Sequence, residues 1–307
     1  MSFLVRLPLD TYRDDALDGF TVTPDFTPGN AQAMMWLSQL AYETDDRDKV
    51  GKILKALKLE MRGFGTNTPI TGLLPRKACF IVASGHGATF VTFAGTDPLK
   101  IQDWFTDLTV APLLNVRHEG FVEAARAVRP EIEAAIGNQG AAEQPVFFTG
   151  HSMGGALAHI AALDRLKAGF RATAVYTFGG PRAGGLDFFN DYTPGLGDRT
   201  FRLVHGEDIV ATVPPSLGGD FRHVGRLLHC PHGSTFAGQT LAPNNGNDPN
   251  LIQAGLNAAL DIGLHIPRFE LPPKIDPRFL DQSPDLPIVV RDHVPANYFR
   301  ALSIPLK

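Results

Sequence analysis

The sequence has little of what marks disulfide-rich, membrane-spanning or nucleic-acid-binding proteins. Its only two cysteines, Cys79 and Cys230, do not make a disulfide framework; we expect buried free thiols, with a bond between the two as the alternative. No stretch of about 20 uninterrupted apolar residues is present, so no transmembrane segment is predicted. The 28 lysines and arginines nearly balance the 32 aspartates and glutamates and form no dense basic run, so no nucleic-acid partner is predicted.

The first residues also lack the apolar stretch of a secretory leader. Pro8 and Asp10 interrupt them before roughly 7–15 apolar residues can accumulate. We therefore expect no Sec-type signal peptide, and a protein that is cytoplasmic or exported by a leaderless route. Apolar residues make up 44% of the chain, enough for a large core at this length. We expect a single domain over residues 1–307.

Hydrophobic periodicity predicts that strands and helices alternate through the middle of the chain. Runs rich in β-branched and aromatic residues predict these strands: 78–83, 88–94, 145–149, 173–178 and 200–204. Apolar residues at helical spacing predict these helices: 31–42 capped by Asn30, 46–60, 120–136, one from Met153 onward, and 184–192. The first two strands should form a hairpin. The later alternation predicts a largely parallel sheet with helices on both faces, an α/β fold.

The two ends of the chain are less regular. Residues 1–30 are polar and aperiodic, and we expect an arm that lies over the surface or is poorly ordered. About 229–285 should be a loop-rich insertion, with one helix around 250–265. A final strand, at 287–290, and a helix are expected within 286–303.

The run Gly150-His151-Ser152-Met153-Gly154 carries a strong chemical signal. A serine hydroxyl is a weak nucleophile at neutral pH and needs both aiming and a neighbouring base. In Gly-x-Ser-x-Gly the serine lies on a sharp turn from a strand to a helix, where side chains at the glycine positions would collide. The expected strand and helix on either side provide that context. We predict that Ser152 is a nucleophile; a glycine-rich turn without chemistry is the alternative.

Further motifs are spaced along the chain. They are Phe93-Ala94-Gly95-Thr96, Asp103-Trp104-Phe105-Thr106-Asp107-Leu108, His118-Glu119-Gly120-Phe121, Thr177-Phe178-Gly179-Gly180-Pro181-Arg182 and Asp208-Ile209-Val210. Together with the serine motif they resemble the lipase class 3 family, which includes triacylglycerol lipases of filamentous fungi. The resemblance covers roughly 30–225 and the tail around His293, whose His-x-Pro-x-x-Tyr pattern is similar to the end of bacterial members. It implies the α/β-hydrolase fold with a lid helix, and a bacterial origin.

In α/β-hydrolases the acid and the histidine follow the serine in that order along the chain. The family motif selects Asp208 as the acid, with the adjacent Glu207 as the alternative. Five histidines follow Asp208, and the resemblance of the tail selects His293 as the base, with His223 as the alternative. Asp208 would orient His293, which would take the proton of Ser152 and deliver it to the leaving alcohol.

N–H donors must also stabilise the negative charge that forms on the ester carbonyl oxygen. Met153 begins the expected helix and supplies one donor from its backbone; the resemblance implies Thr96 for the second. Beyond Thr96, apolar residues fall at i, i+3, i+4 and i+7, so a short helix there would have one apolar face: Ile101, Trp104, Phe105 and Leu108. The resemblance implies that this helix is a lid that opens at a lipid surface. Ordinary core packing explains the same spacing.

Together these residues predict a triacylglycerol lipase, that is, a carboxylic ester hydrolase that acts on acylglycerols through an acyl-enzyme. Its predicted partners are an ester substrate and a transient lipid–water interface. A short-chain or feruloyl esterase or a phospholipase A1 would use the same machinery. A non-catalytic interaction protein on the same scaffold is an alternative from another class.

No cofactor and no metal are predicted. The run His229-Cys230-Pro231-His232 offers only three neighbouring zinc ligands, and the predicted chemistry needs none. The oxygen-rich run Asn244–Asp248 is expected to be a solvated turn rather than a calcium site.

Overall fold

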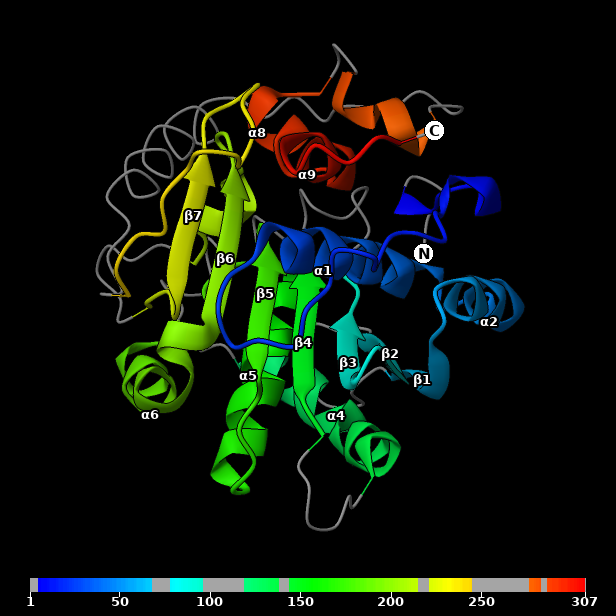
Figure 1. The fold of residues 1–307 in the computed structure, drawn as a ribbon. Coiled ribbons are helices and arrows are strands. Elements are labelled where there is room, and N and C mark those ends of the chain that lie inside the picture. The colour runs from blue at the N-terminus through cyan, green and yellow to red at the C-terminus, as the bar shows by residue number, and fades with distance from the viewer. Residues whose placement is uncertain are drawn as a thin grey trace.

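A seven-stranded mixed sheet forms the centre of the computed structural model, and its strands lie in sequence order from β1 to β7 (Figure 1). The structure describes these residues: 5–67, 78–95, 119–137, 144–214, 221–244, 276–282 and 286–306. The strands are β1 (Glu60–Asn67), β2 (Ala78–Gly85), β3 (Ala88–Phe93), β4 (Val146–His151), β5 (Ala174–Phe178), β6 (Thr200–His205) and β7 (Arg226–Cys230). Strands β1 to β3 pair antiparallel, and β3 to β7 pair parallel. The predicted α/β architecture is confirmed.

Helices cover both faces of this sheet (Figure 1). They are α1 (Pro28–Leu40), α2 (Arg47–Ala56), α4 (Glu119–Ile136), α5 (Met153–Lys167), α6 (Leu186–Leu196), α8 (Ile288–Arg291) and α9 (Pro295–Ala301). Short 3₁₀ turns connect them: η2 (Leu9–Thr11), η3 (Ala41–Glu43), η6 (Gly197–Arg199), η7 (Ile209–Thr212) and η8 (Pro277–Gln282). Within the described ranges, no helix has the length and apolarity needed to cross a membrane.

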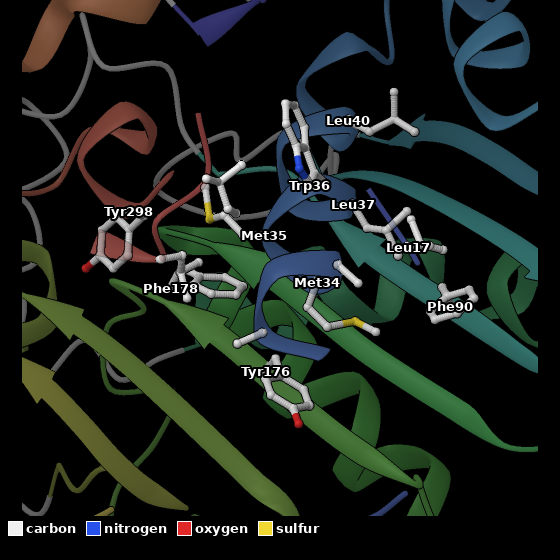
Figure 2. Packing of buried hydrophobic residues seen from close by; sticks show 14 of the residues in the cluster. Leu17, Met34, Met35, Trp36, Leu37, Leu40, Phe90, Tyr176, Phe178 and Tyr298 are labelled. Carbon is white, nitrogen blue, oxygen red and sulfur yellow. The ribbon is translucent and has the colours of Figure 1, made fainter. Parts of the chain in front are cut away.

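Each face of the sheet has its own hydrophobic core. On one face α4, α5 and α6 pack against the sheet through side chains such as Val128 and Leu157. On the other face α1, α2 and α9 do so, and Figure 2 shows the α1 residues Met34 and Leu37 near Phe90 of β3. Residues 5–27 lie against this second core, where Leu7 and Leu17 are buried.

Local signals explain where the helices begin. Thr27 caps α1, because its Oγ1 accepts a hydrogen bond from Asn30 N at 3.0 Å and Pro28 takes the first helical position. The expected cap at Asn30 is therefore wrong by one turn. Asp46 caps α2 in the same manner, through Lys49 N.

The structure adds two strands that the sequence did not predict and removes one that it did. β1 was missed because Gly63 and Gly65 interrupt its pattern; a Cβ at Gly63 would lie 2.6 Å from Ala135 Cβ, so glycine lets α4 pack directly on this strand. β7 is a short edge strand that begins just before the segment expected to be loop-rich, where no element was predicted. The expected strand 287–290 is instead part of α8, which follows Pro287. The expected helix 250–265 lies outside the described residues.

Candidate active site

Ser152 lies on the sharp turn between β4 and α5, with φ 58° and ψ −134°. A non-glycine residue at positive φ is strained and is held there only by its surroundings. Ser152 N donates to Phe178 O at 2.9 Å, which fixes the turn to the neighbouring strand β5. A Cβ at Gly150 would overlap Gly154 O, and a Cβ at Gly154 would overlap Phe93 O. Both motif positions therefore require glycine, as predicted.

The N–H groups that could face a carbonyl oxygen beside Ser152 come from two segments. Met153 is the first residue of α5, and the N–H groups of a first helical turn have no acceptor within the helix. Gly95 packs against the serine, since a Cβ on it would lie 2.6 Å from Ser152 Cβ. The chain thus passes beside Ser152 one residue before Thr96, which itself lies outside the described residues.

A histidine–carboxylate pair lies at the carboxyl ends of the strands. His293 occupies the turn between α8 and α9, and its Nδ1 is 2.9 Å from both Oδ1 and Oδ2 of Asp208, which follows β6. Both side chains are buried. Asp208 also caps η7, since Val210 N donates to its Oδ1 at 2.9 Å. These hydrogen bonds offset the cost of burying the carboxylate.

Tyr298 of α9 completes the surroundings of this carboxylate. Its hydroxyl donates to Asp208 Oδ2 at 2.5 Å and accepts a hydrogen bond from His205 N at 3.3 Å. Burial, followed by the charge of Asp208, raises the pKa of Tyr298 well above its usual value. The hydroxyl therefore stays protonated and acts as a permanent donor to Asp208.

Gly179 makes room for this group. Its φ is 56°, and a Cβ there would overlap Asp208 Oδ2 and lie 3.0 Å from His293 Nδ1. Only glycine combines this backbone conformation with such close approach to the pair. The run Thr177-Phe178-Gly179-Gly180 carried this signal in the sequence.

His151 connects the serine turn to the histidine turn. Its ring centroid is 4.7 Å from that of His293, and its Nε2 donates to His293 O at 2.8 Å. Its Nδ1 lies 2.7 Å from the hydroxyl of Tyr42 in η3. Burial, followed by the charge of His293, lowers the pKa of His151 well below its usual value. His151 is therefore neutral, with Nε2 as donor and Nδ1 as acceptor.

Two reactive atoms remain at the centre of this arrangement. Within the part of the chain that the structure describes, neither Ser152 Oγ nor His293 Nε2 has a hydrogen-bond partner, and both are buried. Ser152 adjoins His151, whose ring packs on that of His293. The geometry can support activation of the serine by the imidazole, with Asp208 on the opposite ring nitrogen.

The alternatives considered for acid and base lie in different surroundings. Glu207 is exposed, whereas its neighbour Asp208 is buried. His223 is buried, but its Nε2 donates to Ala211 O at 2.7 Å. Burial, then Arg202 and Arg182, lower the pKa of His223 well below its usual value, so this histidine resists taking up a proton.

Other predictions meet mixed outcomes. Both cysteines are buried thiols outside any disulfide bond, as expected. Among the described residues, no three His, Cys, Asp or Glu side chains are grouped so that they could hold a metal ion. The lid residues and most of Asn244–Asp248 lie outside the described residues. Tyr42 was not predicted at all, because its hydrogen bond with His151 joins positions that are 109 residues apart along the chain.

Comparison with known proteins gives a consistent picture. Residues 90–218 match the family model "Lipase (class 3)". The chain is 34% identical over 157 residues to "Secreted mono- and diacylglycerol lipase 1" of Fusarium solani, covering 50% of this chain and 46% of that protein. It is 28% identical over 191 residues to "Phospholipase A1-Igamma1, chloroplastic" of Arabidopsis thaliana, covering 58% of this chain and 36% of that protein. The chain thus spans less than half the length of these curated relatives.

A solved structure supports the same fold. It is described as "A serine protease triad forms the catalytic centre of a triacylglycerol lipase", with a TM-score of 0.53 and 25% identity, covering 69% of this chain and 82% of that one. The two curated relatives are fungal and plant proteins, and they lend no support to the expected bacterial origin.

Proposed function

We propose that this chain belongs to the lipase class 3 family and hydrolyses carboxylic esters of acylglycerols through Ser152, His293 and Asp208. The proposal is supported by the buried Asp208–His293 pair, in which Nδ1 lies 2.9 Å from the carboxylate oxygens. The ring of His293 packs on that of His151, which directly precedes Ser152 at positive φ on a strand-to-helix turn. The order of the three residues along the chain is that of α/β-hydrolases.

In the first half of the reaction, His293 Nε2 takes the proton of Ser152 Oγ as the oxygen attacks the ester carbonyl carbon. Asp208, hydrogen-bonded to Nδ1, stabilises the imidazolium that forms. Collapse of the tetrahedral intermediate breaks the bond to the alcohol oxygen. His293 then protonates that oxygen, so the alcohol leaves and an acyl ester on Ser152 remains.

Water completes the cycle. His293 takes a proton from the water as its oxygen attacks the acyl carbon, and then returns a proton to Ser152 Oγ, which releases the fatty acid. In both halves a negative charge forms on the former carbonyl oxygen. We assign its stabilisation to the backbone N–H of Met153 and to Thr96, which follows the Gly95 that packs on Ser152.

The test compares Ser152→Ala with the wild type in two assays. One measures kcat on a soluble nitrophenyl ester, and the other measures labelling by a fluorophosphonate probe. We expect Ser152→Ala to lose at least about 10⁴-fold in kcat and all labelling, with an unchanged melting temperature. Ser234→Ala, at an exposed serine, serves as the control. An active and labelled Ser152→Ala, or a wild type without labelling, would contradict the proposal; the second outcome favours a non-catalytic interaction protein.

The substrate class is the finer part of the proposal. Relatedness to a mono- and diacylglycerol lipase favours acylglycerols, and relatedness to a phospholipase A1 gives a second candidate with the same machinery. Emulsified triolein, a diacylglycerol, a phosphatidylcholine and nitrophenyl esters of increasing chain length separate these classes from a short-chain or feruloyl esterase. We expect the highest kcat/KM on an acylglycerol.

The lid at Ile101, Trp104, Phe105 and Leu108 stays a prediction. Ser152 is fully buried, so an ester reaches it only after some rearrangement. We expect the rate to rise when the substrate concentration crosses the solubility limit and droplets form. A rate that follows one hyperbola through that limit would contradict interfacial activation.

A further inference from the structure

We propose that Asp292 is a positioning residue, which ties the turn that carries Asp208 to the turn that carries His293. This inference rests on the proposed roles of those two residues. Asp292 directly precedes His293 and is completely buried. Its carboxylate has hydrogen-bond partners other than those of Asp208, so we expect it to affect the reaction through the backbone.

The first link joins the two turns directly. Asp292 Oδ2 accepts a hydrogen bond from Glu207 N at 2.8 Å, and Glu207 directly precedes Asp208. Asp292, which precedes the proposed base His293, therefore binds Glu207, which precedes the proposed acid Asp208. The hydrogen bond between His293 and Asp208 runs alongside at 2.9 Å, so two parallel links set the spacing of the turns.

Two histidines lie beside the other carboxylate oxygen. His232 Nδ1 forms a hydrogen bond with Asp292 Oδ1 at 2.6 Å, and His205 Nδ1 lies farther away, at 3.4 Å. Burial acts to raise the pKa of Asp292, but the interactions with His205, Glu207 N and His232 outweigh burial and lower it. The carboxylate is therefore ionised at neutral pH and is a strong acceptor for Glu207 N and His232 Nδ1.

The turn itself is shaped for this contact. Gly206 has φ 56°, and a Cβ on it would overlap Asp292 Oδ2, so only glycine allows the approach. Gly206 N donates to Cys230 O at 2.8 Å, and its carbonyl accepts from His229 Nε2 at 2.9 Å. Thus β7 holds one side of the turn and Asp292 the other.

The arrangement also explains the run His229-Cys230-Pro231-His232, which has no role in the proposed reaction. His229 and His232, which in the sequence resembled metal ligands, instead hold the turn and the carboxylate. Removing Asp292 would leave Glu207 N without its acceptor and free the His293 turn to shift. A displacement of about 1 Å at a reacting group can cost about 10²-fold in rate.

The test compares Asp292→Ala with Asp292→Asn on a soluble short-chain ester. We expect Asp292→Ala to lower kcat about 10²-fold and to change KM by less than about threefold. Asp292→Asn keeps an oxygen acceptor for Glu207 N and should recover about tenfold of that loss. Asp191→Asn, an exposed aspartate that pairs with Lys167, is the matched control and should behave as wild type.

A second variant keeps the proposal testable if the buried substitutions fold poorly. The His232 side chain is 49% exposed, so His232→Ala removes one holder of Asp292 without a buried cavity. We expect it to lower kcat about three- to fivefold at constant KM, a smaller misplacement than that of Asp292→Ala. Wild-type kcat in Asp292→Asn and His232→Ala, or equal losses in Asp292→Ala and Asp292→Asn, would overturn the proposal.

A spectroscopic measurement separates this inference from the proposed function. The Nδ1 proton shared by His293 and Asp208 should give a downfield proton resonance, assigned by its loss in His293→Gln. We expect Asp292→Ala to broaden or shift it, whereas Asp191→Asn should not. A resonance unchanged in Asp292→Ala would overturn the positioning role. An active Ser152→Ala would instead refute the function and leave this measurement valid.

Discussion

Histidines lie in opposite electrostatic settings in two regions of the molecule. At the carboxyl end of β6, His293 binds the carboxylate of Asp208, and His232 binds that of Asp292. In the other region, the buried His159 of α5 and the buried His223 lie instead near Arg202 of β6, whose charge opposes their protonation. His293, His159 and His223 are all buried, so their neighbouring charges distinguish them.

The neighbouring charges distinguish histidines that are suited to proton transfer from histidines that only pack in the core. An imidazole beside a carboxylate can hold a proton during a reaction, since the imidazolium is stabilised there. An imidazole near arginines stays neutral and serves as a core side chain. The setting, more than burial itself, therefore favours His293 over His223 as the base.

The largest expected effect tests this contrast directly. His293→Gln should lower kcat about 10⁴-fold or more, because Ser152 loses its proton acceptor. His223→Gln should keep kcat within about threefold for the folded protein, since its imidazole only binds Ala211 O. Steady-state kinetics measures kcat for both variants, and circular dichroism gives the amount of folded enzyme to which each kcat is referred. A reversed ranking would make His223 the base.

The next effect concerns the carboxylate. Asp208→Asn should lower kcat about 10³–10⁴-fold, because an amide neither stabilises the imidazolium nor enforces the correct tautomer of His293. Glu207→Gln changes the adjacent, exposed carboxylate while its backbone N–H remains available to Asp292. We expect the Glu207→Gln loss to be at least about 100-fold smaller than that of Asp208→Asn. Comparable losses would reopen the choice of acid.

A smaller effect follows from the tyrosine that supports this carboxylate. Tyr298→Phe removes the hydroxyl that donates to Asp208 Oδ2 and leaves His205 N without that acceptor. A hydrogen bond to a charged group contributes about 1.5–3 kcal/mol, so we expect a loss of about 10–100-fold in kcat and a lower melting temperature. Kinetics and thermal unfolding of the same preparations measure the two. Wild-type kcat would mean that Tyr298 only fills space.

Much of the fold was predictable because its signals are local. The strands around β4 to β6 and the helices α4 and α5 follow from hydrophobic period and turn residues within each segment. β1 was not predicted because Gly63 and Gly65, which let α4 pack closely on the strand, interrupt its hydrophobic pattern. Residues 287–290 were read as a strand from their apolar run alone, and short runs of this kind do not distinguish strand from helix.

The candidate site was predictable where chain order and motif carry the information. Ser152 lies on a turn whose glycines are required by close backbone contacts, which a sequence can reveal. Tyr42 and Asp292 were not found as parts of the site, since their roles arise from contacts with His151 and Glu207, which are 109 and 85 positions away. Such pairings depend on how the sheet is assembled.

The last expected effect is on stability rather than on rate, and it depends on pH. Burial, then the charge of Arg202, lower the pKa of His159 to about 3 in the folded state, against about 6.5 in an unfolded chain. Below about pH 6.5 the unfolded chain therefore binds more protons, and stability present above that pH is lost as the pH falls toward about 3, by about 1.4 kcal/mol per pH unit. His159→Leu removes this group, so the slope of unfolding free energy against pH should flatten by that amount. Urea unfolding between about pH 7.5 and 5 measures the slope, and an unchanged slope would show that protonation of His159 does not oppose folding.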